Sequence, residues 1–325
     1  MSKKIILCKP NGFCAGVDRA VKMVDLALEA YGAPVYVNHE IVHNQHVVET
    51  LSAKGAIFVK DSLDEVPIGA RLIYSAHGVP PALRQQAAAR QLKELDATCP
   101  LVTKVHLEAV AFARKGFHIM LIGHANHVEV IGTLGEVPDA ITVVEPKRGA
   151  QLDALIQGLP EPKAEKLIYL TQTTLNVDDC LAVVESLRQR WPHLQAPPSD
   201  DICYATTNRQ NAVKAAAPQV DFFVVVGSPN SSNSKRLVEV AVESGTDAAL
   251  FGSVAEVQTH DFSAVQTVGI TAGASSPQVL VDGVIHHLQG LGFNAIEEFH
   301  HVREDMHFQV PRQFRKDLEE RGIPV

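Results

Sequence analysis

The sequence predicts an α/β protein built from three similar lobes, each with a mainly parallel sheet. Segments with helical periodicity alternate along the whole chain with short strands rich in β-branched residues, as in parallel sheets. This alternation restarts after three cysteines, Cys14, Cys99 and Cys203. Polar loops recur in step with these cysteines, which indicates an internal repeat and not three chance positions.

Each cysteine is followed by a segment whose apolar residues recur at helical spacing. Glycine or proline, which commonly end helices, closes each segment. The three predicted helices run from Cys14 to Gly32, from Cys99 to Gly116 and from Cys203 to Pro218.

Three strands follow in each lobe, separated by further helices. The first strands are predicted at 34–37, 117–123 and 221–227, and the second at 56–59, 141–144 and 248–251. The third are the segments RLIYSAHG, KLIYLTQTT and TVGITAGAS. A fourth strand leads to the next cysteine: LKELDA before Cys99, a stretch near Asp201 before Cys203, and KKIILCK before Cys14. We expect this last, N-terminal strand to pair with the third lobe.

Polar loops follow the first and third strands. The first set is NHEIVHN, HANHVEV and SPNSSNS, and the second set contains His77, Thr173 and Ser275. In open α/β sheets, ligands gather beyond the carboxyl ends of the strands. We therefore expect the three lobes to face one central pocket. The predicted domains are 14–98, 99–202, and 1–13 with 203–299, followed by a tail, 300–325, that packs on a lobe.

The composition restricts the class of protein. A chain of 325 residues that is 46% hydrophobic can bury a sizeable core. Its net charge of −8, with no long basic run, argues against nucleic acid as a partner. No apolar stretch approaches the ~20 residues of a membrane span. We expect a cytoplasmic protein, in which five cysteines indicate metal or redox chemistry and not disulfides.

Cys14, Cys99 and Cys203 are the candidate metal ligands, because each lies between a strand end and a helix start, where the helix dipole favours a thiolate. Three converging thiolates suit either zinc or an iron–sulfur cluster. In a cluster, one iron would keep an open position for a substrate oxygen. Cys8, within a strand, and Cys180, within a helix, are interpreted as buried hydrophobic residues.

The loops supply candidate groups for an anionic substrate. Backbone amides of GSPNSSNS, with Ser231, Ser232 and Asn233, suit a phosphate, and Ser275 occupies the matching place in the second loop set. Three loop histidines can donate hydrogen bonds to a diphosphate, whose charge favours imidazolium. They are His43, His77 and His127.

Glu129 and Thr173 are the candidate catalytic residues. Glu129 is two residues after His127 and can act as a general acid toward a leaving oxygen. Thr173 can orient a water molecule or relay a proton. The alternative for Glu129 is a surface glutamate at the start of a helix, and the alternative for Thr173 is an ordinary threonine at a strand end.

These motifs resemble the 4-hydroxy-3-methylbut-2-enyl diphosphate reductase family, from the last step of the non-mevalonate isoprenoid pathway. The matching stretches are GFCAGVDRAV, YVNHEIVHN, SAHGV, DATCPLVTKVH, LIGHANHVEV, TQTTL, DDICYATTNRQ, GSPNSSNS and TAGASSP. They extend from residue 12 to residue 277, almost the whole chain.

The resemblance implies a trefoil of three lobes around a 4Fe–4S cluster held by Cys14, Cys99 and Cys203, with one open iron as Lewis acid and electron donor. It implies reductive removal of an allylic hydroxyl, which yields isopentenyl and dimethylallyl diphosphate. Glu129 would supply protons, and ferredoxin or flavodoxin would supply electrons. The implied substrate contacts are His43, His77, His127, Thr173, Ser231, Ser232, Asn233 and Ser275.

Two departures from the family pattern flank Glu129. Val128 replaces the usual proline, and IGTLGE replaces a more usual acidic EGT, which we interpret as a sign of a divergent second copy. A zinc-dependent phosphate-ester hydrolase and a non-enzymatic iron–sulfur sensor of isoprenoid diphosphates are the rival hypotheses.

Overall fold

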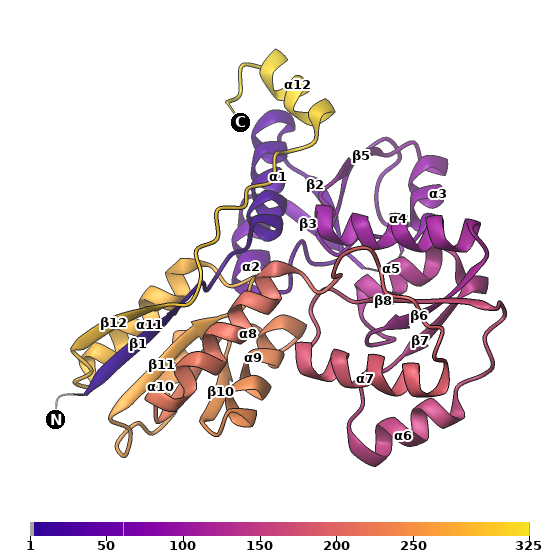
Figure 1. Cartoon of the computed structure of the whole chain (residues 1–325). Coiled ribbons are helices and arrows are strands. Elements are labelled where there is room, and N and C mark those ends of the chain that lie inside the picture. Colours follow the sequence, from indigo (N-terminus) through magenta and orange to yellow (C-terminus); the bar gives the residue numbers. More distant parts are fainter. Residues whose placement is uncertain (1–2, 61, 325) are drawn as a thin grey trace. The chain divides into compact units, whose positions relative to one another are not determined.

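A computed structural model describes residues 3–60 and 62–324 of the chain (Figure 1). It is an α/β fold with three sheets whose strands are all paired in parallel, which confirms the predicted class. The chain divides into two compact units. The first unit comprises Met1–Asp18, Val42–Thr50 and Tyr204–His307, and the second comprises Arg19–Ile41, Leu51–Cys203 and Phe308–Val325.

The first unit contains a five-stranded sheet in the order β10-β9-β11-β1-β12. These strands are β1 (Lys4–Lys9), β9 (Phe222–Val226), β10 (Asp247–Phe251), β11 (Thr267–Ala272) and β12 (Ala295–His300). The helices of this unit are α8 (Tyr204–Ala216), α9 (Ser232–Glu243), α10 (Val254–Gln258) and α11 (Gln278–Gly290).

The apolar strand β9 shows why both faces of this sheet are covered. Successive side chains of a strand point to opposite faces. Phe223 and Val225 pack in the core that includes residues of α8 and α9, whereas Val224 and Val226 pack in the core that includes residues of α11. A central strand buried on both faces needs a continuous apolar run, and FFVVV is one.

The second unit contains two sheets, with strand orders β3-β2-β4-β5 and β7-β6-β8. The strands are β2 (Val35–Asn38), β3 (Ala56–Val59), β4 (Arg71–Tyr74), β5 (Lys93–Asp96), β6 (Phe117–Ile122), β7 (Ile141–Val144) and β8 (Lys166–Thr171). The helices that lie wholly or largely in it are α1 (Ala15–Tyr31), α3 (Pro81–Ala89), α4 (Pro100–Arg114), α5 (Val128–Glu136), α6 (Gly149–Gly158), α7 (Val177–Arg190) and α12 (Arg312–Glu320). Helix α2 (Gln45–Ala53) has residues in both units.

The internal repeat is present in the strand order. In each sheet the first strand after the cysteine helix lies between the second and the third, as β3-β2-β4, β7-β6-β8 and β10-β9-β11. The N-terminal strand β1 pairs with β11, as predicted for a fourth strand of the third lobe. The predicted lobe boundaries themselves stay a prediction.

One predicted strand is wrong. Near Asp201 the described chain has no strand, and only Gln195 forms an isolated bridge, to Ile168. Pro197 and Pro198 follow after Ala196, and proline has no backbone N–H for a sheet ladder.

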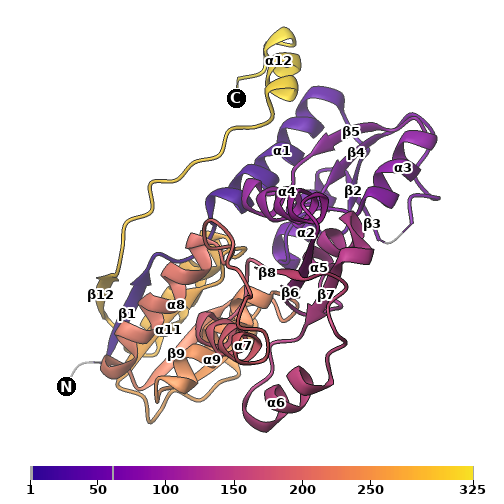
Figure 2. The same cartoon turned by 45° about the vertical axis from the view of Figure 1, so that its right-hand side comes forward.

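Strand β12 was not predicted. It pairs in parallel with the outer edge of β1, where the yellow and indigo arrows lie together (Figures 1 and 2). Its sequence, AIEEFH, is mostly exposed and lacks the apolar run of a central strand.

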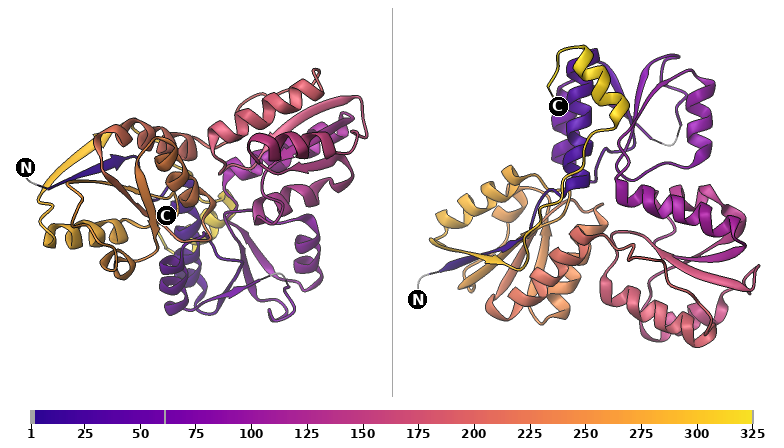
Figure 3. Two further views of the ribbon diagram at one scale, coloured as in Figure 1. Left: turned by 90° about the horizontal axis from the view of Figure 1, so that it is seen from below. Right: turned by 45° about the horizontal axis from the view of Figure 1, so that its top comes forward.

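The tail ends in helix α12, which lies beside α1 (Figure 3, right). The Phe314 ring stacks on Tyr31 with the ring centroids 6.2 Å apart. Phe314 and Leu318 are buried although α12 is otherwise strongly polar. Within the part of the chain that the structure describes, no helix has the length and apolar character to cross a membrane.

Candidate functional site

The three predicted metal ligands share one backbone arrangement. Each cysteine is half-buried and precedes the first residue of a helix, α1, α4 or α8. Each cysteine N–H donates to a carbonyl two residues beyond the end of a third strand. The bonds are Cys14 to Ala274 at 3.1 Å, Cys99 to Ala76 at 2.9 Å and Cys203 to Thr173 at 3.1 Å.

These bonds refine the alignment of the second polar loops. Thr173 corresponds by its cysteine contact to Ala76 and Ala274. His77 and Ser275 therefore lie one residue further along their loops than the position of Thr173. The sequence pattern could not show this offset, because all three loops are short and polar.

Cys8 and Cys180 are buried, as predicted. Burial raises the pKa of each of these thiols to about 12, and nearby carboxylates add to the effect at Cys180. Neither cysteine forms a disulfide. Both therefore stay protonated and behave as small apolar side chains.

In the second unit, Glu129 and Thr173 are in direct contact. The Thr173 backbone N–H donates to Glu129 Oε1 at 2.6 Å, and the Thr173 hydroxyl donates to Oε2 at 3.0 Å. Glu129 belongs to the first turn of α5 and is 3% exposed. Helix α5 thus directs a carboxylate onto the loop that follows β8.

Burial is the main cause of the raised pKa of Glu129. Desolvation raises its pKa to about 7, and the negative charge of Asp201 acts in the same direction. The two hydrogen bonds from Thr173 oppose this rise, because they favour the carboxylate. A carboxylic acid with a pKa near 7 can hold and release a proton at neutral pH.

Two of the predicted histidines lie in the second unit near this carboxylate. His127 caps α5, and its Nδ1 accepts a hydrogen bond from the Glu129 N–H at 3.2 Å. Its ring meets that of His77 edge to face, with the centroids 6.1 Å apart. The structure therefore brings His77, His127, Glu129 and Thr173 into one contiguous group.

The remaining predicted substrate contacts lie in the first unit. Ser231 caps α9, and its hydroxyl oxygen accepts from the Ser234 N–H at 3.3 Å. Asn233 Oδ1 accepts from the Ala274 N–H at 2.9 Å, which connects the two polar loops. The side chains of Ser231, Ser232, Asn233 and Ser234 are all buried at the start of α9. We call these four residues the phosphate loop, after the prediction for the first three, and phosphate binding there stays a prediction.

Ser275 connects this loop region to His43. Its hydroxyl donates to the His43 carbonyl at 2.9 Å, and the Ser228 hydroxyl accepts from the Gln45 N–H at 3.1 Å. The segment that begins α2 is thus tied to both loops of the five-stranded sheet.

Two glycines allow Ser234 to sit between the two loops. A Cβ on Gly227 would lie 2.2 Å from Ser234 Oγ, and one on Gly273 would lie 2.0 Å from it. The Ser234 hydroxyl donates to Ser231 Oγ at 3.0 Å. Glycine is required at both positions by this close approach.

Sequence reasoning missed several residues around the loops. Asn44 caps α2 through the Val47 N–H, and Arg209 is fully buried in α8. Asp201 Oδ2 accepts from the Thr171 N–H at the end of β8. A signal for Arg209 existed: it lies four residues from both Ala205 and Val213, on the apolar face of its helix.

The cysteines fit a soft metal centre by their chemistry, since each is half-buried, outside any disulfide and at a helix N-terminus. Within residues 3–60 and 62–324, no three His, Cys, Asp or Glu side chains are grouped closely enough to hold a metal ion. Cys14 belongs to the first unit, and Cys99 and Cys203 to the second. The ligand set stays a prediction.

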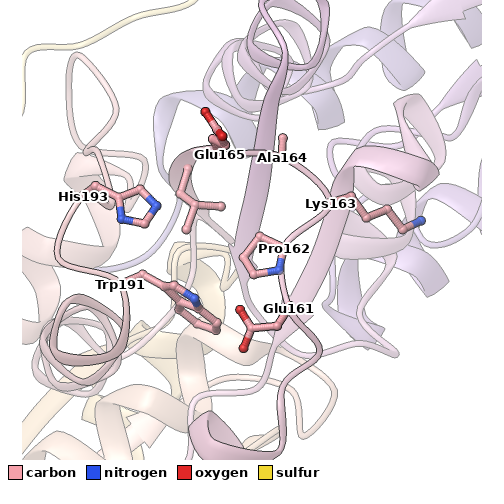
Figure 4. A pocket seen from close by; sticks show the side chains of 8 residues that line it. Glu161, Pro162, Lys163, Ala164, Glu165, Trp191 and His193 are labelled. Carbon is pink, nitrogen blue, oxygen red and sulfur yellow. The ribbon is translucent and has the colours of Figure 1, made fainter.

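Two surface hollows in the second unit lie away from these loops. The one in Figure 4, about 320 Å³, contains Glu165 and is bordered by Trp191 and His193. Glu165 directly precedes β8, whereas Thr173 follows it. The other hollow, about 400 Å³, includes Arg71 and Lys93, the first residues of β4 and β5. Both are therefore at amino ends of strands, opposite the candidate catalytic edge.

The fold and these loops define a class of protein: a three-sheet α/β protein with polar loops and cysteine turns at the carboxyl ends of parallel strands. Residues 5–289 match the family model described as LytB protein, and the chain belongs to that family. This agrees with the resemblance found in the motifs.

Two relatives of high identity carry the same name. It is 52% identical over 324 residues to a 4-hydroxy-3-methylbut-2-enyl diphosphate reductase from Acidothermus cellulolyticus, covering 99% of this chain and 93% of the relative. It is 53% identical over 314 residues to the reductase of that name from Rhodococcus opacus, covering 96% and 91%.

Solved structures agree with the sequence comparison. The structure of the E-1-hydroxy-2-methyl-but-2-enyl-4-diphosphate reductase from Plasmodium falciparum matches with a TM-score of 0.92 and 39% identity, covering 99% of this chain and all of that one. A structure of (E)-4-hydroxy-3-methyl-but-2-enyl diphosphate reductase, titled the terminal enzyme of the non-mevalonate pathway, matches with a TM-score of 0.61 and 31% identity, covering 89% and 99%.

Proposed function

We propose that this protein reduces 4-hydroxy-3-methylbut-2-enyl diphosphate to isopentenyl and dimethylallyl diphosphate. The allylic C–O bond breaks, two electrons and two protons enter, and the hydroxyl leaves as water. The observation that carries this proposal is the buried Glu129–Thr173 pair, which places an acid with a pKa of about 7 at the polar loops of a chain in this family.

Glu129 supplies the proton that the leaving hydroxyl needs. The general acid must be protonated near neutral pH, and burial provides this condition. Thr173 donates to both carboxyl oxygens and thereby orients the carboxyl group of Glu129. To relay the acidic proton, the Thr173 hydroxyl must first rotate, so that it accepts from Glu129 and passes its own proton to the leaving hydroxyl.

The phosphate loop binds the diphosphate in this proposal. Ser231, Ser232 and Asn233 supply hydroxyl and amide groups at the start of α9, where the helix dipole favours an anion. Ser275 and His43 add donors from the neighbouring segments, and His77 and His127 add imidazoles. Seven polar groups allow an acidic protein to bind an anionic ester without an arginine cluster.

Cys14, Cys99 and Cys203 would hold a 4Fe–4S cluster at the centre of a trefoil of three lobes. When bound, such a cluster supplies the two electrons one at a time and a Lewis-acidic iron toward the hydroxyl oxygen. A ferredoxin or flavodoxin is the proposed electron donor, and the cytoplasm the proposed compartment. The chain's own contribution is to hold the three thiols by their backbone turns.

Anaerobic purification tests this function against its rivals. We expect a brown protein with iron and acid-labile sulfide in the amount of one cluster. A colourless zinc protein would point to the hydrolase instead. Turnover of the hydroxylated diphosphate with a one-electron donor then distinguishes the reductase from a sensor, which would bind the ester and not convert it.

Glu129→Gln tests the proton donor. We expect unchanged substrate binding and a loss of turnover of about 10²–10⁴-fold, the usual contribution of a general acid. Glu108→Gln is the matched control, because Glu108 in α4 also has a pKa of about 7 through burial but lies outside the loops. This control should keep most of its turnover. Full activity of Glu129→Gln would remove Glu129 from the mechanism.

A further inference from the structure

Two side chains of α8 bind the turn that carries Cys14, one on each side of the cysteine. Arg209 Nη2 donates to the Gly12 carbonyl at 2.7 Å, two residues before the cysteine. The Tyr204 hydroxyl oxygen accepts from the Ala15 N–H at 3.3 Å, one residue after it. All of these residues belong to the first unit. The turn also bonds to the end of β11, through the amides of Gly12 and Cys14.

The charge that holds this turn is deeply buried. Arg209 is fully buried, and its Nη1 donates to the Ala205 carbonyl at 3.0 Å. Its Nε has no hydrogen-bond partner among the described residues. A buried guanidinium with an unmet donor depends strongly on an opposing charge, because desolvation of an unpaired ion is costly.

Glu304, in the irregular segment between β12 and α12, provides that charge. Its Oε1 and Oε2 lie 3.1 and 3.3 Å from Arg209 Nη1. Asn208, the preceding residue of α8, donates to Oε1 at 3.0 Å. The Glu304 side chain is only 14% exposed, so this ion pair is poorly screened by solvent.

We propose that Glu304 is a positioning residue for Cys14. It acts through Arg209: the carboxylate neutralises and orients the guanidinium, whose Nη2 then holds the Gly12 carbonyl and the turn that carries the thiol. The C-terminal segment thereby controls how firmly one of the three cysteines is held. The positioning of Cys14 does not depend on the proposed function. Only its expected effect on how firmly a cluster is held rests on that function.

The first test uses the full-length, metal-free protein and does not depend on a cluster. The rate of alkylation of each cysteine by iodoacetamide is measured by peptide mass spectrometry. We expect Glu304→Ala to raise the Cys14 rate about tenfold, the effect of losing a charge-assisted hydrogen bond. Glu304→Gln keeps an acceptor for Asn208 and Arg209 and should give a smaller increase.

The internal and matched controls separate positioning from unfolding. Cys99 and Cys203 should react at wild-type rates in the same samples. Asp305→Asn removes the adjacent carboxylate, which pairs with Arg303 at the surface, and should leave Cys14 unchanged. An unchanged Cys14 rate in Glu304→Ala, or an equal increase at all three cysteines, would overturn the proposal.

The second test uses the anaerobically loaded protein and measures the rate of iron loss to a chelator. We expect about tenfold faster loss in Glu304→Ala, with partial recovery in Glu304→Gln. If wild-type protein carries no cluster, the proposed function fails while the alkylation result still decides the positioning role. If wild type is loaded and Glu304→Ala loses iron at the wild-type rate, the positioning role fails and the proposed function stands.

Discussion

At the scale of single residues, the raised pKa of Glu129 has the clearest measurable consequence. Its carboxyl group is almost completely removed from solvent, and Thr173 donates one hydrogen bond to each of its two oxygens. Burial, assisted by the negative charge of Asp201, outweighs these two hydrogen bonds, so the pKa of Glu129 rises from the ordinary 4.5 to about 7. The group should therefore destabilise the folded protein when it ionises.

We expect this effect in the pH dependence of stability. The unfolded chain releases the Glu129 proton near pH 4.5, whereas the folded protein keeps it until about pH 7. The folded state binds more protons in this window, so its stability falls as pH rises from 4.5 to 7. The loss is about 3 kcal/mol and is complete above pH 7.

Denaturant unfolding of the metal-free protein at a series of pH values measures this contribution. Glu129→Gln lacks the titration and shares all others, so the difference in unfolding free energy between the two proteins isolates it. Parallel curves from pH 4 to pH 8 would contradict the raised pKa.

At the scale of elements, the phosphate loop depends on two glycines outside it, Gly227 and Gly273, which leave room for Ser234. We expect Gly273→Ala to lower the free energy of unfolding by about 1–3 kcal/mol, because the added methyl group would overlap Ser234 Oγ. Ser234→Ala removes that atom. It should therefore cost less in the Gly273→Ala background than in the wild type, which a double-mutant cycle in denaturant would measure.

A glycine in an open position provides the control for this prediction. Gly290→Ala in the last turn of α11 places a methyl group where no atom lies within 4 Å, and it should have little effect. Equal losses for Gly273→Ala and Gly290→Ala would show that contact with Ser234 is not the cause.

Elements with a strong local pattern were predictable, and those that depend on distant partners were not. The strands at 56–59 and 141–144 have the predicted bounds, because β-branched runs flanked by turns specify strands locally. Strand β12 exists because the edge of β1 is there to pair with, which its own sequence does not show. The cysteines and loops followed from the repeat, but Arg209 needed the position of Glu304, almost a hundred residues away.

At the scale of the whole molecule, the C-terminal tail connects to two different places in the chain. Glu304 meets Arg209 in the first unit, and Phe314 packs on Tyr31 in the second. Arg19, in α1, also donates to the Gln309 carbonyl at 2.9 Å. The tail is therefore an integral part of both units.

We expect Phe314→Ala to destabilise the protein by about 3 kcal/mol, since Phe314 is 2% exposed and truncation leaves a cavity. Thermal and denaturant unfolding would measure the loss. Leu181→Ala serves as the control, because Leu181 in α7 is 62% exposed and should change stability little. If Phe314→Ala is as stable as the wild type, the packing of the Phe314 ring does not contribute to the stability of its unit.

The cysteine turns have a consequence for protein engineering. The bonds that hold Cys14, Cys99 and Cys203 are donated by their backbone amides, so the anchoring does not use the sulfur. Serine or alanine at these positions keeps the same anchor, whereas proline, which lacks an N–H, cannot. We therefore expect single, double and triple replacements of these cysteines to keep the fold, and under the proposed function to lose turnover. Such inactive variants could be used to capture binding partners.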